Sequence, residues 1–363
     1  MKKVLISGYY GFGNTGDEAI LETLSNEFSK SNIKAEVLSS NPQKTQKAYG
    51  VKAYKRSNLQ EIVKAIKNCD AVISGGGSLF QDVTSSGSLY YYLGIVIIAQ
   101  VLGKKIHIFS QGIGPVKKEL NRKIFAKIIN RVETISVRDQ ISLEELAWLG
   151  VNKPKQMLTN DPVFMLQPAS KDTGRKILQE AGVESEGKLT IGIAARSWNN
   201  NNDSISQIAE IINQIIKEFD ANVVMFPFHY PEDLDFAYKI AEKTQNKPYI
   251  LKEEYKPSEI MSAIGLMDIN IGVRLHSLIF SVCMGVPVIG ITYDPKIDGF
   301  LKEIGLRPVC NYDNMQCELI IKEIKRIIDN KDEILNKIME AKGFASNKVF
   351  DNFNKLIGEV NNG

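Results

Sequence analysis

The sequence predicts an α/β protein with two Rossmann-like, doubly wound domains, each built on a parallel sheet. Along the whole chain, short runs rich in β-branched residues alternate with longer amphipathic stretches, which is the pattern of βαβ units. Runs such as Val4-Leu5-Ile6 are apolar at every position, as expected for strands that are covered on both faces. A length of 363 residues also fits two domains of about 150 residues each.

The first half of the chain is expected to alternate strands with helices. The strands are expected at Val4–Ser7, Ala35–Ser39, Ala71–Ser74, Lys105–Ser110, Thr134–Val137 and Gln156–Thr159. The helices are expected at Asp17–Ser29, Leu59–Lys67, Tyr90–Leu102, Asn121–Arg131 and Ile141–Leu149. Connections of this length allow parallel pairing, because a parallel connection must cross back over the sheet.

The second half repeats the same rhythm. Its strands are expected at Thr190–Ala194, Asn222–Phe226, Tyr249–Leu251, Ile269–Val273, Val288–Ile291 and Arg307–Val309. Its helices are expected at Gln207–Glu218, Leu234–Lys243, Ser258–Ala263, Leu275–Met284 and Cys317–Asn330. The repetition indicates a second parallel sheet rather than one continuous domain.

The alternation is interrupted between Pro162 and Gly187, where Gln167-Pro168-Ala169-Ser170 is typical of a linker. The expected division is an N-terminal domain at 1–168, a C-terminal domain at 169–340 and a last helix at 341–363 that packs back on the first domain. Two such domains facing a cleft is the GT-B arrangement of transferases and of some sugar epimerases. The fold alone does not fix the function, so the residues at the sites must decide.

Composition excludes several classes of protein. With 44% hydrophobic and 24% charged residues the chain has globular averages, and a net charge of +3 gives no argument for nucleic acid binding. Four scattered cysteines and three histidines form no zinc-site spacing, which predicts no metal and a reduced, cytosolic protein. The apolar run after Met1 is too short for a signal peptide. The stretch Tyr90–Leu102 is shorter than the about 20 residues that a membrane-spanning helix needs.

Three glycine-rich segments each follow an expected strand of the first domain. They are Gly8–Ala19, Ser74–Asp82 and Ser110–Pro115. Glycine lets the backbone turn tightly and approach a ligand, and the following helix offers free N–H groups to an anion. In open parallel sheets ligands bind at the carboxyl ends of the strands, where all three segments lie. One such segment could be an ordinary turn, but three favour a binding site.

A dinucleotide site is an alternative for the first segment, because Gly11–Gly16 has the spacing GxGxxG. Such a site also needs an acidic residue at the end of the second strand, and Glu36 lies at the start of its strand instead. Asp17 and Glu18 would repel a pyrophosphate and fit better as first-turn acids that face the helix dipole. Asn14 either caps this helix or points to a ligand.

Arginine and histidine gather at the strand ends of the second domain. Arg196 follows one strand, Phe226-Pro227-Phe228-His229 ends the next strand, and Arg274-Leu275-His276 marks a strand-to-helix junction. Arginine binds phosphate or carboxylate with two parallel hydrogen bonds, and histidine suits general acid–base catalysis. His229 could instead cap a loop, and Tyr293 and Lys296 could belong to an interdomain hinge. No GxSxG elbow, Walker loop or HExxH motif is present.

Four ordered motifs together carry a resemblance to a known family. They are GYYGFGNTGDEA at 8–19, GGGSLFQD at 75–82, QGIGP at 111–115 and RLH at 274–276. The chain resembles the polysaccharide pyruvyl transferase family over nearly its whole length, and within it the CsaB type of bacterial cell-wall polymer synthesis. Phe80, where leucine is expected, is a small departure.

The resemblance implies a GT-B-like fold, phosphoenolpyruvate as the donor, no nucleotide sugar and a pyruvate ketal as the product. Phosphoenolpyruvate is then a substrate, and no cofactor is expected. For the CsaB type it implies a terminal N-acetylmannosamine bridged at O4 and O6, on a lipid-linked precursor of a secondary cell-wall polymer that serves S-layer anchoring.

Individual residues of the four motifs and of the strand ends can be assigned roles in this reaction. The catalytic candidates are His276 as the acid and Asp82 or Asp17 as the base. The donor-binding candidates are Arg196, Arg274, His229, Ser277 and Lys296, and the acceptor-binding candidates are Asn14, Gly13, Gly77, Gln81, Gln111 and Tyr293. A phosphate and a carboxylate on one donor require clustered cations and backbone N–H groups, which the second domain supplies.

Two other functions remain open at this point. A nucleotide-sugar-dependent GT-B glycosyltransferase would bind UDP or GDP, and a non-catalytic sugar- or anion-binding module would bind phosphoenolpyruvate without releasing phosphate. A lipid-linked acceptor predicts an enzyme at the cytoplasmic face of the cell membrane, in peripheral contact with the bilayer. No nucleic acid is expected as a partner, and the oligomeric state is left open, a homo-oligomer included.

Overall fold

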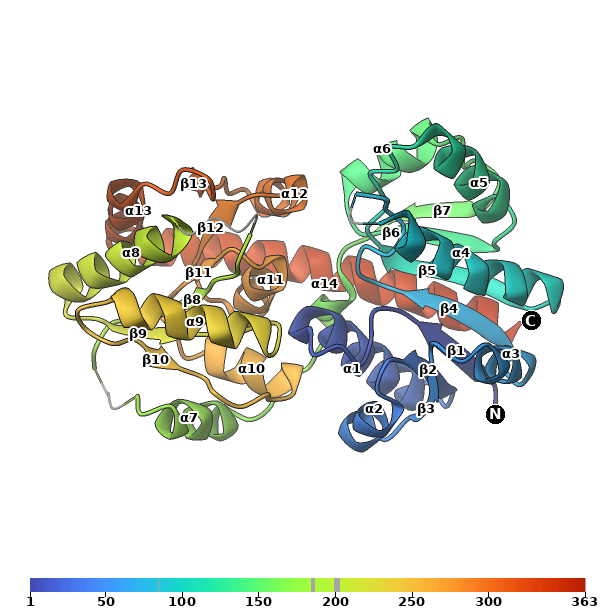
Figure 1. Ribbon diagram of the computed structural model, residues 1–363, viewed down its shortest axis with the longest axis horizontal. Helices are drawn as coiled ribbons and strands as arrows, with labels where there is room; N and C mark the ends of the chain where they lie inside the picture. The colour runs from blue at the N-terminus through green and yellow to red at the C-terminus, as the bar shows by residue number, and fades with distance from the viewer. Residues whose placement is uncertain (84, 184–186, 199–202, 363) are drawn as a thin grey trace. The chain divides into compact units, whose positions relative to one another are not determined.

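A computed structural model gives the fold (Figure 1) and describes residues 1–83, 85–183, 187–198 and 203–362. The chain divides into two compact units. Unit 1 holds Met1–Phe12, Asp17–Leu166 and Ala345–Gly363, and unit 2 holds Gly13–Gly16 and Gln167–Phe344. Each unit is built on a parallel sheet with helices in the connections, so the predicted fold class is confirmed.

Unit 1 contains a parallel sheet with the strand order β3-β2-β1-β4-β5-β6-β7. The strands are β1 (Lys3–Ser7), β2 (Lys34–Ser39), β3 (Lys52–Lys55), β4 (Ala71–Gly75), β5 (Lys105–Gln111), β6 (Thr134–Val137) and β7 (Lys155–Leu158). The helices are α1 (Thr15–Lys30), α2 (Pro42–Tyr49), α3 (Leu59–Lys67), α4 (Ser86–Val101), α5 (Glu119–Ile129), α6 (Gln140–Trp148) and the 3₁₀ turn η1 (Pro162–Met165). The strand order reverses between β1 and β4, which is where ligands of such sheets bind.

Unit 2 contains a second parallel sheet, with the order β10-β9-β8-β11-β12-β13. The strands are β8 (Thr190–Ala194), β9 (Asn222–Met225), β10 (Tyr249–Ile250), β11 (Ile269–Gly272), β12 (Val288–Thr292) and β13 (Cys310–Asn311). The helices are α7 (Lys171–Glu180), α8 (Asp203–Phe219), α9 (Glu232–Lys243), α10 (Pro257–Ile264), α11 (Leu275–Met284), α12 (Pro295–Glu303), α13 (Cys317–Asp329) and the first part of α14 (Lys331–Asn361), whose residues from Ala345 onward belong to unit 1. Here the order reverses between β8 and β11.

Several element boundaries differ from the prediction. The strand β3 and the helix α2 were not predicted, because Lys52–Lys55 carries little apolar signal and pairs only at the sheet edge. The strand expected at Arg307–Val309 begins at Cys310, and α4 begins at Ser86, where the Ser85 side chain accepts a hydrogen bond from the Gly87 N–H.

The division into units also differs from the expected boundaries by a few residues. It falls after Leu166 and after Phe344 rather than after 168 and 340. The last helix is longer than expected, because it begins at Lys331. The segment Gly13–Gly16, expected in the first domain, groups with unit 2. Within the described residues, no helix combines the length and the apolar character that crossing a membrane requires.

Both faces of the sheet in unit 1 are covered, as the continuous apolar strands predicted (Figure 1). On one face Ile106 and Ile108 belong to the core cluster that includes Leu93 of α4. On the other face the Phe109 ring packs against Phe353 of α14 at 5.9 Å between ring centroids. Alternate residues of β5 therefore contact helices on opposite sides of the sheet.

His107 is fully buried on the side of β5 that faces α14. Its Nδ1 lies 2.9 Å from the Thr134 hydroxyl, and burial lowers its pKa to about 4, although the Glu359 carboxylate opposes this. The folded chain therefore keeps this imidazole neutral at a pH where the unfolded chain protonates it.

The stability of unit 1 should fall as the pH falls from about 6.5 to about 4, because the unfolded chain binds a proton at His107 that the folded chain does not bind. Between pH 7 and pH 4.5 this group should lower the free energy of unfolding by roughly 2–3 kcal/mol. A His107→Gln variant should lose that part of the pH dependence. Urea unfolding of both proteins at the two pH values measures it, and equal losses of stability would contradict the assignment.

Candidate functional site

The candidate site of unit 2 lies where the strand order of its sheet reverses. Ala194 of β8 pairs with Gly272 of β11, and the Val273 N–H donates to the Ala194 carbonyl at 3.0 Å. Arg196 and Arg274 each lie two residues beyond this pair, on neighbouring strand ends. Neighbouring strands are about 4.8 Å apart, so the register brings two arginines to the carboxyl ends of two adjacent strands, where ligands of such sheets bind.

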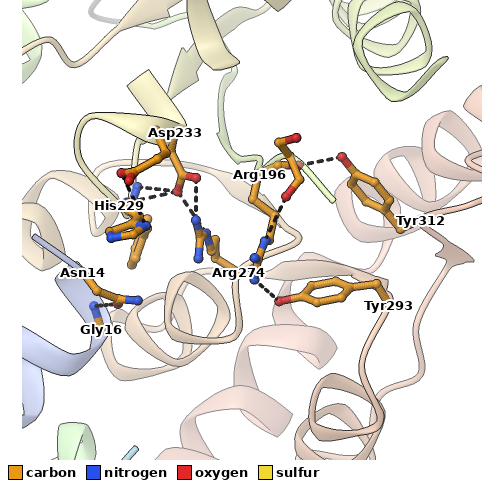
Figure 2. Close-up of polar contacts among 11 residues, drawn as sticks. Asn14, Gly16, Arg196, His229, Asp233, Arg274, Tyr293 and Tyr312 are labelled. Atoms are coloured by element: carbon orange, nitrogen blue, oxygen red, sulfur yellow. Dashed lines mark hydrogen bonds and ion pairs between the residues drawn. The ribbon is translucent and has the colours of Figure 1, made fainter. Parts of the chain in front are cut away.

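Arg274 is held by a buried carboxylate, as Figure 2 shows. Its Nε donates to Asp233 Oδ2 at 2.9 Å and its Nη2 to Asp233 Oδ1 at 2.5 Å. Asp233 is 3% exposed, and it lies in the first turn of α9. This bidentate pairing fixes the plane of the guanidinium and leaves Nη1 without a hydrogen bond among the described residues.

The same carboxylate shapes the loop that carries His229. Asp233 Oδ2 also accepts hydrogen bonds from the backbone N–H groups of Phe228 at 3.2 Å and His229 at 3.0 Å. The His229 ring faces the exposed Glu232, with Nδ1 3.5 Å from the carboxylate. One buried acid therefore orders both the loop after β9 and the arginine after β11.

The glycine segment Gly13–Gly16 pairs with this loop. The Thr15 N–H donates to the Phe228 carbonyl at 2.7 Å, the Tyr230 N–H donates to the Gly13 carbonyl at 3.1 Å, and Asn14 and His229 form an antiparallel bridge. Asn14 Oδ1 accepts a hydrogen bond from the Gly16 N–H at 3.0 Å (Figure 2). Of the two roles open for Asn14, the capping of α1 is therefore observed.

His276 lies in the first turn of α11 and packs against Gly16. A Cβ atom added at Gly16 would lie 2.0 Å from His276 Nδ1, a distance that real atoms do not reach. Glycine is therefore required at this position for the imidazole to keep its place. Ser277 follows, and its buried hydroxyl donates to the Arg274 carbonyl at 2.7 Å, so it positions the helix start rather than facing outward.

Arg196 is held by aromatic rings instead of a carboxylate. Its Nη1 donates to the Tyr293 hydroxyl at 2.6 Å, and the guanidinium lies 5.0 Å from the ring centroids of both Tyr293 and Trp198. The buried Tyr312 donates its O–H to the Arg196 carbonyl at 2.6 Å (Figure 2). Arg196 makes no ion pair with an acid in the described part of the chain, so its positive charge is available to an anion.

Unit 1 uses several of its predicted residues to build the glycine turns themselves. The fully buried Gln111 accepts from the Ser74 hydroxyl at 2.9 Å and donates to the Gly76 carbonyl at 3.2 Å. Gly77 has a φ of +70°, and a Cβ added there would lie 2.9 Å from the Asp17 carboxylate. Gln111 thus stabilises the glycine turn through these hydrogen bonds, and the Asp17 carboxylate lies next to Gly77.

Asp82 is also engaged within unit 1. Its carboxylate accepts from the Lys117 N–H at 2.7 Å, the Lys118 N–H at 3.0 Å and the Asn121 amide at 2.8 Å. Burial raises its pKa, but these hydrogen bonds outweigh burial and hold the pKa below its ordinary value. Asp82 as a general base stays a prediction, and this environment weighs against it. Gln81 Oε1 accepts from the Val83 N–H at 2.7 Å.

The structure brings together part of the predicted set. In unit 2 the strand ends carry Arg196, His229, Arg274, His276, Tyr293 and the segment with Gly13 and Asn14, while Lys296 lies in the first turn of α12. Sequence reasoning gave no role to Asp233, Trp198 or Tyr312. Among the described residues no group of histidine, cysteine and acidic side chains could hold a metal ion.

Solved structures of two-domain proteins share the fold of this chain. The Staphylococcus aureus MnaA–UDP structure matches with a TM-score of 0.68 and 13% identity, covering 99% of this chain and 97% of that one. The Neisseria meningitidis UDP-GlcNAc 2-epimerase bound to UDP-GlcNAc matches with a TM-score of 0.66 and 14% identity, covering 99% of this chain and 100% of that one. Anabaena HepE in complex with UDP-glucose matches with a TM-score of 0.65 and 12% identity, covering 99% of each chain. At such identities the likeness shows a shared GT-B-like fold alone.

Sequence similarity shows the family to which the chain belongs. Residues 14–295 match the model of the polysaccharide pyruvyl transferases, and the chain belongs to this family. It is also 24% identical over 319 residues to the amylovoran biosynthesis protein AmsJ of Erwinia amylovora, and the match covers 83% of this chain and 76% of that protein. The chain is therefore a transferase of the pyruvyl-transferring class that acts on polysaccharide.

A Gly16→Ala variant should lose activity without losing its fold. The added methyl would displace the His276 ring, and a shift of about 1 Å in a catalytic group can lower the rate about 10²-fold. Gly343→Ala is the matched control, because a Cβ there meets nothing within 4 Å. Pyruvyl transfer and thermal unfolding are measured on both variants. Normal transfer by Gly16→Ala would show that the His276 position does not matter.

Proposed function

We propose that this chain transfers pyruvate from phosphoenolpyruvate to a terminal sugar as a cyclic ketal and releases phosphate. The proposed acceptor is N-acetylmannosamine, bridged at O4 and O6, at the end of a lipid-linked precursor of a secondary cell-wall polymer. The observation that carries the donor assignment is the pair Arg196 and Arg274 at paired strand ends beside His276. Membership of the pyruvyl transferase family supports the reaction type.

The chemistry of the donor fits the two arginines at these strand ends. Phosphoenolpyruvate carries a phosphate ester and a carboxylate on the same carbon, so it needs two cationic groups close together. Arg274 offers Nη1 while Asp233 fixes its other edge, and Arg196 offers a charge that no acid neutralises in the described residues. The first turn of α11 adds backbone N–H groups and the positive end of the helix dipole.

The proposed reaction needs one acid and one base. A proton is added to the methylene carbon of phosphoenolpyruvate, and the neighbouring carbon becomes oxocarbenium-like. A sugar hydroxyl attacks this carbon and loses its proton, the C–O bond to phosphate breaks, and the second hydroxyl closes the ring and loses its proton. His276 is the proposed acid, either for the methylene carbon or for the departing phosphate. Asp17, beside Gly77, is the proposed base in preference to Asp82.

The cellular setting is part of the same proposal. A lipid-linked acceptor would bring the enzyme to the cytoplasmic face of the membrane as a peripheral protein. No cofactor is required, because the leaving phosphate of the donor drives the transfer. The curated relative AmsJ is named for polysaccharide biosynthesis, which agrees with a saccharide acceptor.

Phosphate release from phosphoenolpyruvate should depend on an added acceptor that ends in N-acetylmannosamine.

Arg196→Gln should lower kcat/KM for phosphoenolpyruvate about 10²–10³-fold, since it removes one charged hydrogen-bond donor and leaves no buried acid unpaired. Arg274→Lys should act similarly while keeping a cation beside Asp233. His276→Ala should lower kcat about 10²–10⁴-fold. Arg326→Gln, on α13 and paired with Glu323, is the control.

Two outcomes would overturn this function. Transfer from a UDP- or GDP-sugar, with stabilisation by the free nucleotide, would instead support a glycosyltransferase like the structural neighbours. Binding of phosphoenolpyruvate with no phosphate release in the presence of any N-acetylmannosaminyl acceptor would support a non-catalytic binding module.

A further inference from the structure

Arg56 lies at the ligand-binding edge of the sheet in unit 1. It directly follows β3, and its backbone N–H donates to the Ser39 carbonyl at the end of β2 at 2.9 Å. Its side chain extends to the end of β1, where Nη1 lies 3.5 Å from the Gly8 carbonyl. The guanidinium therefore lies at the start of the first glycine segment, beside the point where the strand order of this sheet reverses.

Aromatic rings surround this guanidinium. Its carbon lies 4.2 Å from the ring centroid of Tyr91, 5.0 Å from that of Phe12 and 5.4 Å from that of Tyr92. Tyr9 stacks on Phe12 with centroids 4.1 Å apart and planes at 8°, and Tyr91 donates its O–H to the Arg56 carbonyl at 3.0 Å. Such rings attract the faces of a guanidinium and hold it in one orientation.

The hydrogen-bonding edge of Arg56 is nearly unused. A guanidinium has five N–H donors, but within the described residues the Arg56 side chain donates only two hydrogen bonds, to the Gly8 carbonyl at 3.5 Å and to the Tyr92 hydroxyl at 3.4 Å. Both are longer than the usual distance of about 2.9 Å. No carboxylate forms an ion pair with Arg56 anywhere in the described residues. A half-buried cation that is held by its faces and lacks a counter-ion is suited to bind an anion in the plane of its N–H groups.

We propose that Arg56 binds an anionic group of the acceptor glycan, in a subsite backed by Phe12 and Tyr91. The ligand class is a saccharide with a phosphate or carboxylate close to the sugar that is modified. The anion would come either from the diphosphate that joins the glycan to its lipid or from an acidic neighbouring sugar. That the ligand is the acceptor glycan rests on the proposed function. That the ligand is anionic rests only on Arg56 and the aromatic rings around it.

Arginine rather than lysine is required by this geometry. Two parallel N–H groups match two oxygens of a phosphate or carboxylate, and the planar group stacks between rings. Phe12 is 36% exposed, so its ring also offers apolar contact to a sugar that lies beside the anion.

The test compares three soluble acceptors with the same terminal N-acetylmannosaminyl disaccharide: one with a short alkyl diphosphate, one with an adjacent glucuronate, and one neutral. Arg56→Gln should raise KM for one of the two charged acceptors about 10–100-fold, the loss expected for a charged hydrogen-bonding group. KM for phosphoenolpyruvate, kcat, and all constants for the neutral acceptor should not change. Arg56→Lys should restore only part of the affinity.

The matched control is Arg122→Gln, because Arg122 lies 4.6 Å from the Trp148 ring and belongs to the same unit. The charged acceptor that responds to Arg56→Gln identifies the source of the anion. Equal losses on charged and neutral acceptors, or no loss on either charged one, would overturn the subsite.

Titration calorimetry of the acceptors without phosphoenolpyruvate separates this proposal from the proposed function. If the native protein binds a charged acceptor and Arg56→Gln does not, the subsite stands even when no phosphate is released from phosphoenolpyruvate. If phosphate is released normally and acceptor binding is the same in both proteins, the function stands and the subsite is wrong.

Discussion

The Asp233 carboxylate is the group on which the geometry of the second unit depends most. Its two oxygens accept hydrogen bonds from the Arg274 guanidinium and from two backbone N–H groups of the loop after β9. That loop in turn pairs with Gly13–Gly16, and Gly16 leaves room for His276. Because Asp233 is buried, losing either partner of the ion pair would leave an uncompensated charge at a cost of about 3–5 kcal/mol.

Three arginines illustrate two ways to hold a cation for a ligand. Arg274 is oriented by an acid, which fixes it firmly but neutralises its charge. Arg196 and Arg56 are oriented by aromatic rings, which fix the plane of the guanidinium and leave the charge in place. The strand ends that carry Arg274 and Arg196 therefore provide one rigidly held hydrogen-bond donor and one unneutralised cation. This combination suits a small substrate with two anionic groups, because both guanidinium groups can donate hydrogen bonds to it and Arg196 adds net positive charge.

Much of the fold and part of the candidate site could be predicted from the sequence. Continuous apolar strands and glycine segments at their ends are local signals, so both sheets and the strand ends that carry Arg196 and Arg274 were predicted correctly. The edge strand β3 was missed because its residues are half exposed and polar. The partners of the arginines were missed for another reason, which is sequence distance.

Asp233 lies 41 residues before Arg274, Tyr312 lies 116 residues after Arg196, and Tyr92 lies 36 residues after Arg56. No spacing rule links such residues, since only the order of the strands brings them together. Gln111 is a different case. Its place in a glycine motif predicted a contact with a ligand, whereas the hydrogen bonds of its side-chain amide stabilise the glycine turn.

A crystal structure with bound phosphoenolpyruvate tests the central claim most directly. The account predicts donor density at the carboxyl ends of β8 and β11, with phosphate or carboxylate oxygens about 3 Å from both the Arg196 and Arg274 guanidinium groups. The His276 ring should face the donor from the first turn of α11. Donor density away from these two arginines, or a nucleotide in their place and no binding of phosphoenolpyruvate, would contradict it.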